Sequence, residues 1–171
     1  QNILRFVLPY GAFGIFVLIN TITNQDLTPL YYYVFVILFM IAAEAMSKGN
    51  PARQLMLFSG LGIIALLIGI FSDGMVSIYA LISVGLFCST LWPCIFTLAI
   101  KGLGAYTNKG SGFLIMMIMG GGFISLFQGV LVDQESIGIR LSFFVGVACF
   151  LYLFFYAWKA PGILKQQGVE V

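Results

Sequence analysis

The chain has 171 residues, of which 61% are hydrophobic and only 8% are charged, and its formal net charge is +2. A soluble domain averages about 25% charged residues, so this composition argues against a water-soluble fold. The net charge is also too small to suggest a nucleic-acid partner. The sequence has no histidine, which removes imidazole metal clusters and the Ser-His or Cys-His pairs of nucleophilic catalysis. The composition therefore predicts a protein that lies in the lipid bilayer and needs no metal or cofactor.

Segments without charge divide the chain into six candidate membrane spans. A helix needs about 20 apolar residues to cross a hydrocarbon core of about 30 Å, and all but the second approach or exceed that length. The period-two alternation of a transmembrane barrel is absent, and the first span lacks the cleavage site of a signal peptide. We therefore predict an all-α membrane protein, a single bundle of six transmembrane helices over residues 1–171. The predicted spans cover about residues 4–24, 30–47, 54–72, 75–101, 110–132 and 139–158.

The basic residues predict how these spans are oriented. Of the eight Lys and Arg residues, only Arg140 falls in a segment on the side opposite the termini, and that side carries Asp26, Asp73, Asp133 and Glu135. Basic residues are retained in the cytoplasm. Both termini are therefore predicted to be cytoplasmic, in a multi-pass protein of the cell inner (plasma) membrane. The basic residues on the side of the termini are Arg5, Lys48, Arg53, Lys101, Lys109, Lys159 and Lys165.

The first span ends in polar residues, among them Asn20 and Asn24. These two amides are four residues apart and share one helix face. They are either wetted at the membrane surface or line a polar cavity, and the shared face favours the cavity.

Glu44 is the one acid inside an apolar span. An ionised carboxylate near mid-membrane costs about 2.5–3.5 kcal/mol on insertion scales. However, Glu44 lies one turn from the cytoplasmic end and has Lys48 at i+4, the favourable order for a helical ion pair. The sequence favours this ion pair over a proton-carrying carboxylate, and both interpretations stay open.

The fourth span carries the residues best suited to chemistry. Pro93 has no N–H, so it leaves the carbonyl of Ser89 without its helical donor and predicts a kink. Gly85, Ser89, Trp92 and Phe96 follow at steps of three or four residues and share one face. A sugar presents apolar C–H faces and hydroxyls, which an aromatic platform flanked by hydroxyl and amide groups can bind. The alternative is that Trp92 only packs at the kink.

The fifth span carries a stripe of small residues, Gly121, Ser125 and Gly129. This stripe predicts close approach of another helix. Gln128 is different, because an amide within lipid needs a polar partner and should face the bundle or a cavity. The third and sixth spans show no chemical residue and are predicted to be support helices that face lipid, the sixth ending at Pro161 and Gly162.

An ordered series of motifs fills residues 85–133, and it resembles the sugar–proton symporters of the L-fucose permease and glucose/galactose permease type, within the major facilitator superfamily. This resemblance implies that the chain is the C-terminal six-helix half of a two-half transporter. The first and fourth spans would then line the cavity, and the N-terminal half would carry the coupling carboxylates. The matching residues are Pro93, Ile95-Phe96, Ile100-Lys101, Leu103-Gly104, Gly110-Ser111, Phe113, Gly120-Gly121-Gly122 and Asp133.

The expected function is secondary active transport of a monosaccharide, a hexose or 6-deoxyhexose, coupled to protons. The expected partners are the sugar, the proton, the lipid bilayer and the N-terminal half of the same transporter. A six-helix scaffold or partner subunit that transports nothing is the alternative, and an intramembrane enzyme is the weakest one. We expect no catalytic residue. The residues expected to bind substrate are Asn20, Asn24, Ser89, Trp92, Phe96 and Gln128.

Overall fold

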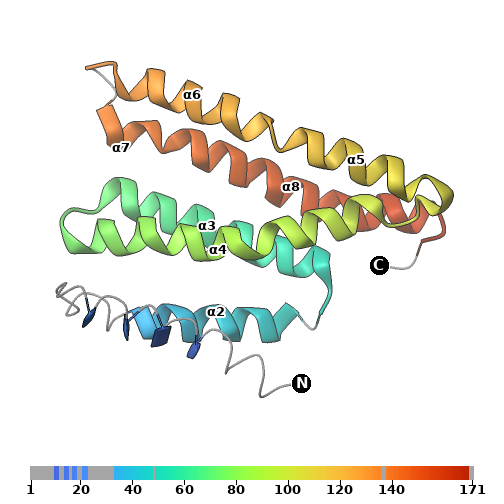
Figure 1. Ribbon diagram of the computed structural model, residues 1–171, viewed down its shortest axis with the longest axis horizontal. Helices are drawn as coiled ribbons and strands as arrows, with labels where there is room; N and C mark the ends of the chain where they lie inside the picture. The colour runs from blue at the N-terminus through green and yellow to red at the C-terminus, as the bar shows by residue number, and fades with distance from the viewer. Residues whose placement is uncertain are drawn as a thin grey trace. The chain divides into compact units, whose positions relative to one another are not determined.

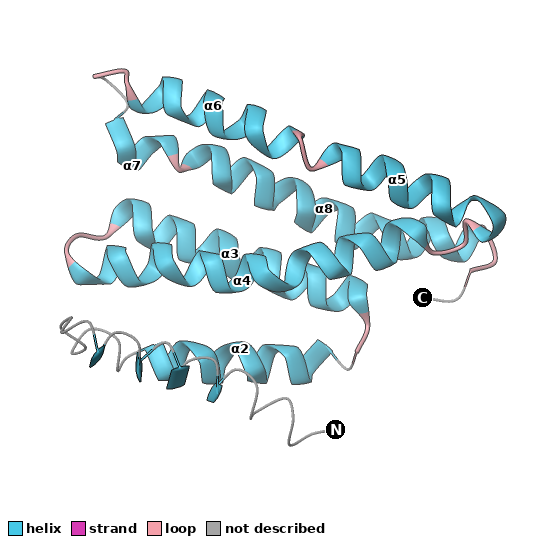
Figure 2. Ribbon diagram, in the orientation of Figure 1, coloured by secondary structure: helices cyan, strands magenta, loops and turns pink. Residues whose placement is uncertain are grey.

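The structure, a computed structural model, describes residues 10–11, 14–15, 17–18, 21–22, 33–47, 49–135 and 138–169. All regular structure within these residues is helical (Figure 2), which confirms the predicted all-α class for this part of the chain. The chain divides into two units, Gln1–Lys48 and Gly49–Val171, and each is described by itself.

In the first unit, the described residues between 10 and 22 are helical, and the Thr21 hydroxyl donates to the carbonyl of Val17 at 2.8 Å. Helix α2 follows at Tyr33–Ser47. The predicted spans 4–24 and 30–47 extend beyond the described residues, so both stay predictions. Lys48 also lies outside them, and its predicted ion pair with Glu44 is untested.

The second unit holds the helices that are long and apolar enough to cross a membrane. Within the described residues there are four such stretches: Pro51–Phe71, Met75–Ile100, Gly104–Val132 and Gly138–Gln166. They run alternately up and down (Figure 1). Their helices are α3 (Pro51–Phe71), α4 (Met75–Ile100), η2 (Gly104–Tyr106), α5 (Thr107–Met117), α6 (Gly120–Val132), α7 (Gly138–Ser142) and α8 (Phe144–Gln166).

Helix α3 begins where its sequence provides a cap. The Asn50 side chain accepts hydrogen bonds from the backbone N–H groups of Ala52 and Arg53, at 3.0 and 3.2 Å. Pro51 occupies the first helical position, where its missing N–H costs nothing. These residues fix the start of α3, which matters below because this end of the helix faces the candidate site.

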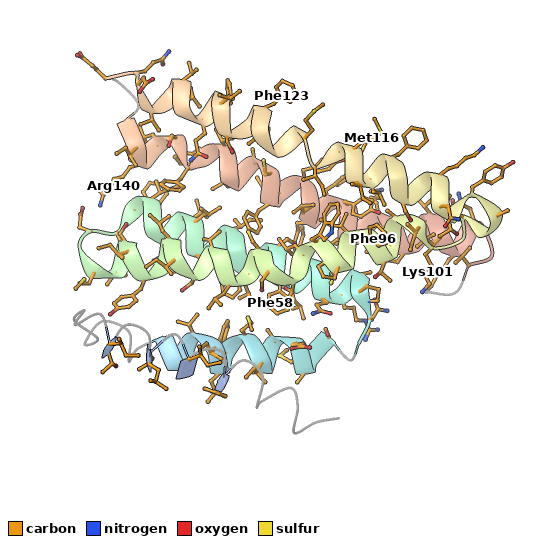
Figure 3. The ribbon with its side chains drawn as sticks, in the orientation of Figure 1. Phe58, Phe96, Lys101, Met116, Phe123 and Arg140 are labelled. Atoms are coloured by element: carbon orange, nitrogen blue, oxygen red, sulfur yellow. The ribbon has the colours of Figure 1, made fainter. Side chains whose placement is uncertain are left out.

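Helix α3 packs against both α4 and α8. Leu55 and Phe58 (the latter labelled in Figure 3) are fully covered. The ring of Phe58 lies 6.1 Å from that of Phe87 on α4. Gly62 and Gly69 make room for the neighbouring helices. A Cβ atom on Gly62 would overlap the ring of Phe150 on α8, and one on Gly69 would lie 2.7 Å from the Leu81 side chain on α4.

The third span is predicted to face lipid, but nine of its 21 residues are buried, and the helix packs against α4 and α8. Among its large apolar side chains, only Ile64, Ile68 and Phe71 are exposed. The helix is apolar on every side, so its periodicity could not show which side packs. Small residues mark its packed side: the buried ones are Ala52, Ser59, Gly62, Ala65 and Gly69.

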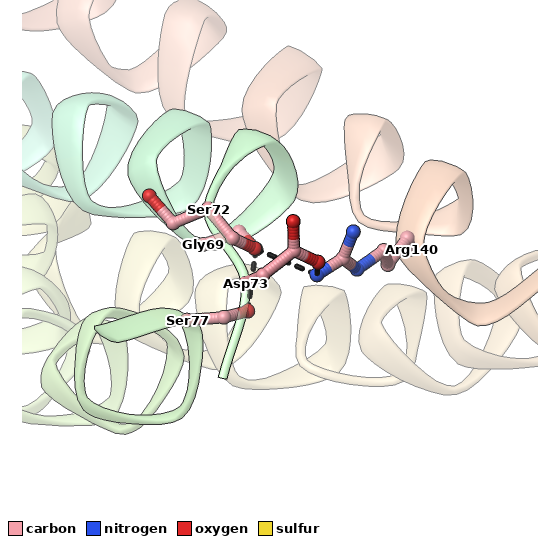
Figure 4. A network of polar contacts seen from close by, with 5 residues as sticks. All are labelled: Gly69, Ser72, Asp73, Ser77 and Arg140. Carbon is pink, nitrogen blue, oxygen red and sulfur yellow. Dashed lines mark hydrogen bonds and ion pairs between the residues drawn. The ribbon is translucent and has the colours of Figure 1, made fainter. Parts of the chain in front are cut away.

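Polar contacts join the α3–α4 turn to the beginning of α7 (Figure 4). The Ser77 hydroxyl donates to the carbonyl of Gly69 at 2.6 Å. Arg140 donates to the carbonyl of Ser72 at 2.7 Å and pairs with the Asp73 carboxylate at 2.5 Å. Exposed ion pairs contribute about 0–1 kcal/mol to the free energy of unfolding. This pair therefore adds little to stability and mainly fixes the position of α7.

Two predicted spans contain interruptions. Residues 118–119 separate α5 from α6, with i→i−3 bonds such as Ile118 to Ile115 at 3.1 Å. The sixth span begins with short α7, and α8 then continues through Pro161 to Gln166, so the predicted end at Pro161 and Gly162 is wrong. One missing hydrogen bond at Pro161 does not stop the helix. Gly168, with φ +75°, ends it instead.

The two ends of the second unit differ in charge because its helices alternate in direction. Among the described residues, the end that holds the α4–α5 connection and the end of α8 carries most of the basic residues, whereas the opposite end carries the described acids and one arginine. The basic residues are Arg53, Lys101, Lys109, Lys159 and Lys165. The residues of the opposite end are Asp73, Asp133, Glu135 and Arg140.

Substituting Gly62 by Ala tests the packing of α3 on α8. The new methyl group would overlap Phe150, and such overpacking costs about 1–3 kcal/mol. Gly121→Ala is the matched control, because a Cβ there meets nothing within 4 Å and alanine favours a helix by about 1 kcal/mol. We expect a lower thermal midpoint of the detergent-purified protein for Gly62→Ala alone. Equal midpoints for the two variants would contradict this packing.

Candidate functional site

Helix α4 turns one face away from its packing partner. Gly85, Ser89 and Trp92 are exposed and Phe96 is half-buried, while the buried residues of α4 lie on the opposite side. The Trp92 and Phe96 rings are 6.2 Å apart between centroids and tilted by 46°. Trp92 keeps 41% of its surface exposed. The structure thus brings Ser89, Trp92 and Phe96 together on one open helix face with a pair of aromatic rings.

Pro93 lies inside α4 without ending it. Because proline lacks an N–H, the carbonyl of Ser89 has no donor from the next turn. The Ser89 hydroxyl donates to the carbonyl of Leu86 at 2.6 Å, and the Thr97 hydroxyl donates to that of Pro93 at 2.7 Å. Each hydroxyl uses its proton within the helix, but its oxygen can still accept a hydrogen bond. This part of α4 therefore offers a group of acceptors.

A cleft of about 320 Å³ lies between this part of α4 and the beginning of α3. Gln54 of α3 contributes a carboxamide, which can both donate and accept. Trp92 and Phe96 do not line the cleft, so the cleft and the aromatic pair occupy adjacent sides of α4 that meet at Ser89. The lining residues are Gly49, Pro51, Gln54, Ser89, Thr90, Pro93, Cys94 and Thr97.

The sequence interpretation missed Gln54, Thr90 and Thr97. Gln54 stands next to Arg53 at the beginning of a span, where a polar residue is expected at the membrane surface. The threonines were indistinguishable from residues that bond their own helix. Only the arrangement of α3 against α4 shows that all three face one cleft.

The other predicted site residues do not join this cleft. Gln128 is half-buried on α6, and it is not among the residues that line the cleft. The small stripe beside it stays open, because a Cβ on Gly121 or Gly129 would meet nothing within 4 Å. The predicted close helix approach at this stripe is therefore not made within the described residues. Asn20 and Asn24 lie outside those residues, and their part in a site stays a prediction.

Comparison with known proteins finds no matching family model and no matching solved structure. It does find curated relatives. A glucose/galactose transporter of Brucella abortus is 37% identical over 116 residues, which cover 68% of this chain and 28% of that protein. An L-fucose-proton symporter of Haemophilus influenzae is 30% identical over 146 residues, 83% of this chain and 34% of that protein. An L-fucose-proton symporter of Escherichia coli is 32% identical over 111 residues, 65% of this chain and 25% of that protein.

The chain spans about a third or less of the length of these relatives. The relatives are transporters, and the chain holds four helices able to cross a membrane within its described part, which together identify a multi-pass membrane protein. The names of the relatives also confirm the resemblance predicted from residues 85–133. The chain is therefore similar, over most of its length, to glucose/galactose transporters and L-fucose-proton symporters.

Proposed function

We propose that the chain is the C-terminal six-helix half of a proton-coupled monosaccharide transporter of the major facilitator superfamily. The similarity to glucose/galactose and L-fucose transporters supports a hexose or 6-deoxyhexose as substrate. One structural observation carries the proposal: an exposed aromatic pair, Trp92 and Phe96, stands beside a polar cleft at a proline inside an apolar helix. Such a combination fits a sugar better than an apolar solute.

The aromatic pair on α4 and the adjacent cleft would make different contacts with a bound sugar. The Trp92 indole covers an apolar C–H face of the ring. The Ser89 carbonyl and the hydroxyl oxygens of Ser89 and Thr97 accept hydrogen bonds from sugar hydroxyls, and the Gln54 amide donates and accepts. Asn20, Asn24 and Gln128 stay proposed as further substrate-binding residues of the full transporter. In the full transporter, the two halves would rock around a sugar held between them.

Proton coupling requires a titratable group that is exposed alternately to the two sides of the membrane. Asp73 is 88% exposed and paired with Arg140, and Asp133 and Glu135 are exposed at the same end. These acids stay in contact with water on one side. We therefore place the coupling carboxylates in the N-terminal half, as the family resemblance implies, with Glu44 as the alternative.

The charge difference between the ends of the second unit supports the proposed orientation. The basic end with Lys101, Lys109 and Lys165 would face the cytoplasm of a cell inner membrane, together with both termini. The alternative of a scaffold without transport activity is not favoured, because the relatives named above are transporters.

Trp92→Ala should weaken sugar binding to the full-length protein by about tenfold or more, because losing one aromatic platform costs on the order of 1–2 kcal/mol. Trp92→Phe should retain part of the affinity. Trp158→Ala is the control, since Trp158 is an exposed tryptophan of α8 outside the cleft. The Trp158→Ala protein should bind sugar with unchanged affinity. Binding is measured by titration calorimetry with glucose, galactose and L-fucose. Unchanged affinity in a well-folded Trp92→Ala protein would make Trp92 a packing residue.

Pro93→Ala should change stability and binding in opposite directions. Alanine restores the N–H that bonds the Ser89 carbonyl, and a helix interior favours alanine over proline by about 3 kcal/mol. The thermal midpoint should therefore rise. The same bond removes a sugar acceptor from the cleft, so affinity should fall severalfold. A variant that is both more stable and equally tight in binding would exclude the carbonyl from the site.

Cysteine labelling tests the orientation. In a protein whose native cysteines are replaced by serine, single cysteines at Asn108 and Gln167 should react with an impermeant maleimide only from the cytoplasm. A cysteine at Gln134 should react only from outside. These positions lie at opposite ends of the helices of the second unit. Labelling of Gln134 from the cytoplasm would reject the proposed topology.

A further inference from the structure

Helices α6 and α8 enclose an apolar groove of about 460 Å³. Both belong to stretches long and apolar enough to cross a membrane, which would place the groove at the level of the hydrocarbon core. Its walls are largely exposed, with Tyr152 at 68% and Phe127 at 56%. The lining residues are Ile124, Phe127, Val145, Ala148, Cys149, Tyr152 and Leu153.

We propose that this groove binds an acyl chain of an anionic phospholipid, whose phosphate group is held by Lys159 and Lys109. The proposal needs only a multi-pass membrane protein and does not depend on sugar transport. It assigns a ligand to a surface that the proposed transport site does not use.

Lys159 connects the groove to the basic end of the unit. It follows Tyr152 by seven residues, which places it on the same side of α8 and about 10 Å further along the helix. Lys109 lies near the start of α5, in the same long stretch as the α6 wall but 15 residues before Ile124, which is about 22 Å further along the helix. A lipid whose chain lies in the groove and extends toward this end would therefore meet Lys159 first and Lys109 beyond it.

The surroundings of these lysines favour an anionic headgroup. The Nζ atom of Lys159 lies 5.0 Å from the Trp158 ring, and that of Lys109 lies 5.9 Å from the Tyr106 ring. Such aromatic residues gather at the membrane interface. The described acids of this unit all lie at the opposite end, and Glu170 is outside the described residues. Within the described part, neither lysine has a carboxylate partner.

The shape of the groove favours an acyl chain over a second helix. Helices approach each other closely in membranes through small residues. Of the residues that line this groove, only Ala148 and Cys149 are small, and the others are branched or aromatic. A flexible chain can follow such an uneven surface, whereas a helix would touch only its ridges.

Native mass spectrometry of the full-length protein in detergent tests the proposal with palmitoyl-oleoyl phosphatidylglycerol and the corresponding phosphatidylcholine. We expect phosphatidylglycerol to bind more tightly. Lys159→Gln and Lys109→Gln should each weaken its binding about fivefold, the effect of one basic residue near an anionic headgroup. Ala148→Phe, at an exposed position, should fill the groove and weaken binding of both lipids.

Lys165→Gln is the matched control, because Lys165 lies on the same helix about 120° around from Lys159. It should leave phosphatidylglycerol binding within twofold of the parent protein. Equal losses for Lys159→Gln and Lys165→Gln would mean that only the general positive charge attracts the lipid. Equal affinity for the two lipids, or no effect of Ala148→Phe in a folded protein, would also overturn the site.

Discussion

The close packing of α3 against α4 and α8 is the constraint on which the second unit depends. Lipid removes the hydrophobic force between membrane helices, so they must be held by close van der Waals contact and a few polar bonds. Gly62 and Gly69 supply the contact, and the bond from Ser77 to the Gly69 carbonyl supplies a polar link. Each contact also fixes how its helices are rotated about their axes.

That rotation decides what remains available on α4. The packed side of α4 is used by α3, so the side with Ser89, Trp92 and Phe96 faces outward. The same packing brings the beginning of α3, with Gln54, opposite Pro93. A proline inside a helix destabilises it by about 3 kcal/mol relative to an ordinary residue, which would donate the missing hydrogen bond. In the proposed transporter, the carbonyl of Ser89 that Pro93 leaves free would accept a hydrogen bond from the bound sugar, which would explain a proline at this position.

The sequence could predict the helical class and much of the local chemistry. Pro93 identified the released carbonyl, and helical spacing placed Trp92 beside Phe96. It could not predict the direction of packing, because α3 is apolar on every side and offers no periodic signal. For the same reason it missed Gln54, whose role depends on which helix lies across from it. The predicted end of the sixth span at Pro161 was wrong for a different reason. A proline weakens a helix locally, but the residues after Pro161 continue α8 to Gln166.

The stretch Gly104–Val132 is apolar enough to cross a membrane, yet none of its residues is buried. Met116 and Phe123 point outward from it (Figure 3). In the proposed transporter, part of this surface and the open face of α4 would be completed by an N-terminal half. We therefore expect the proposed sugar transport to need more than these 171 residues.

Vesicle reconstitution tests this claim most directly. Residues 1–171 are reconstituted alone, or together with the remaining segment of the full-length protein, and uptake of labelled glucose, galactose and L-fucose is followed under an imposed pH gradient. We expect no concentrative uptake by residues 1–171 and proton-driven uptake by the combination. Concentrative uptake by residues 1–171 alone, abolished by Glu44→Gln, would contradict the half-transporter proposal and make Glu44 the coupling site.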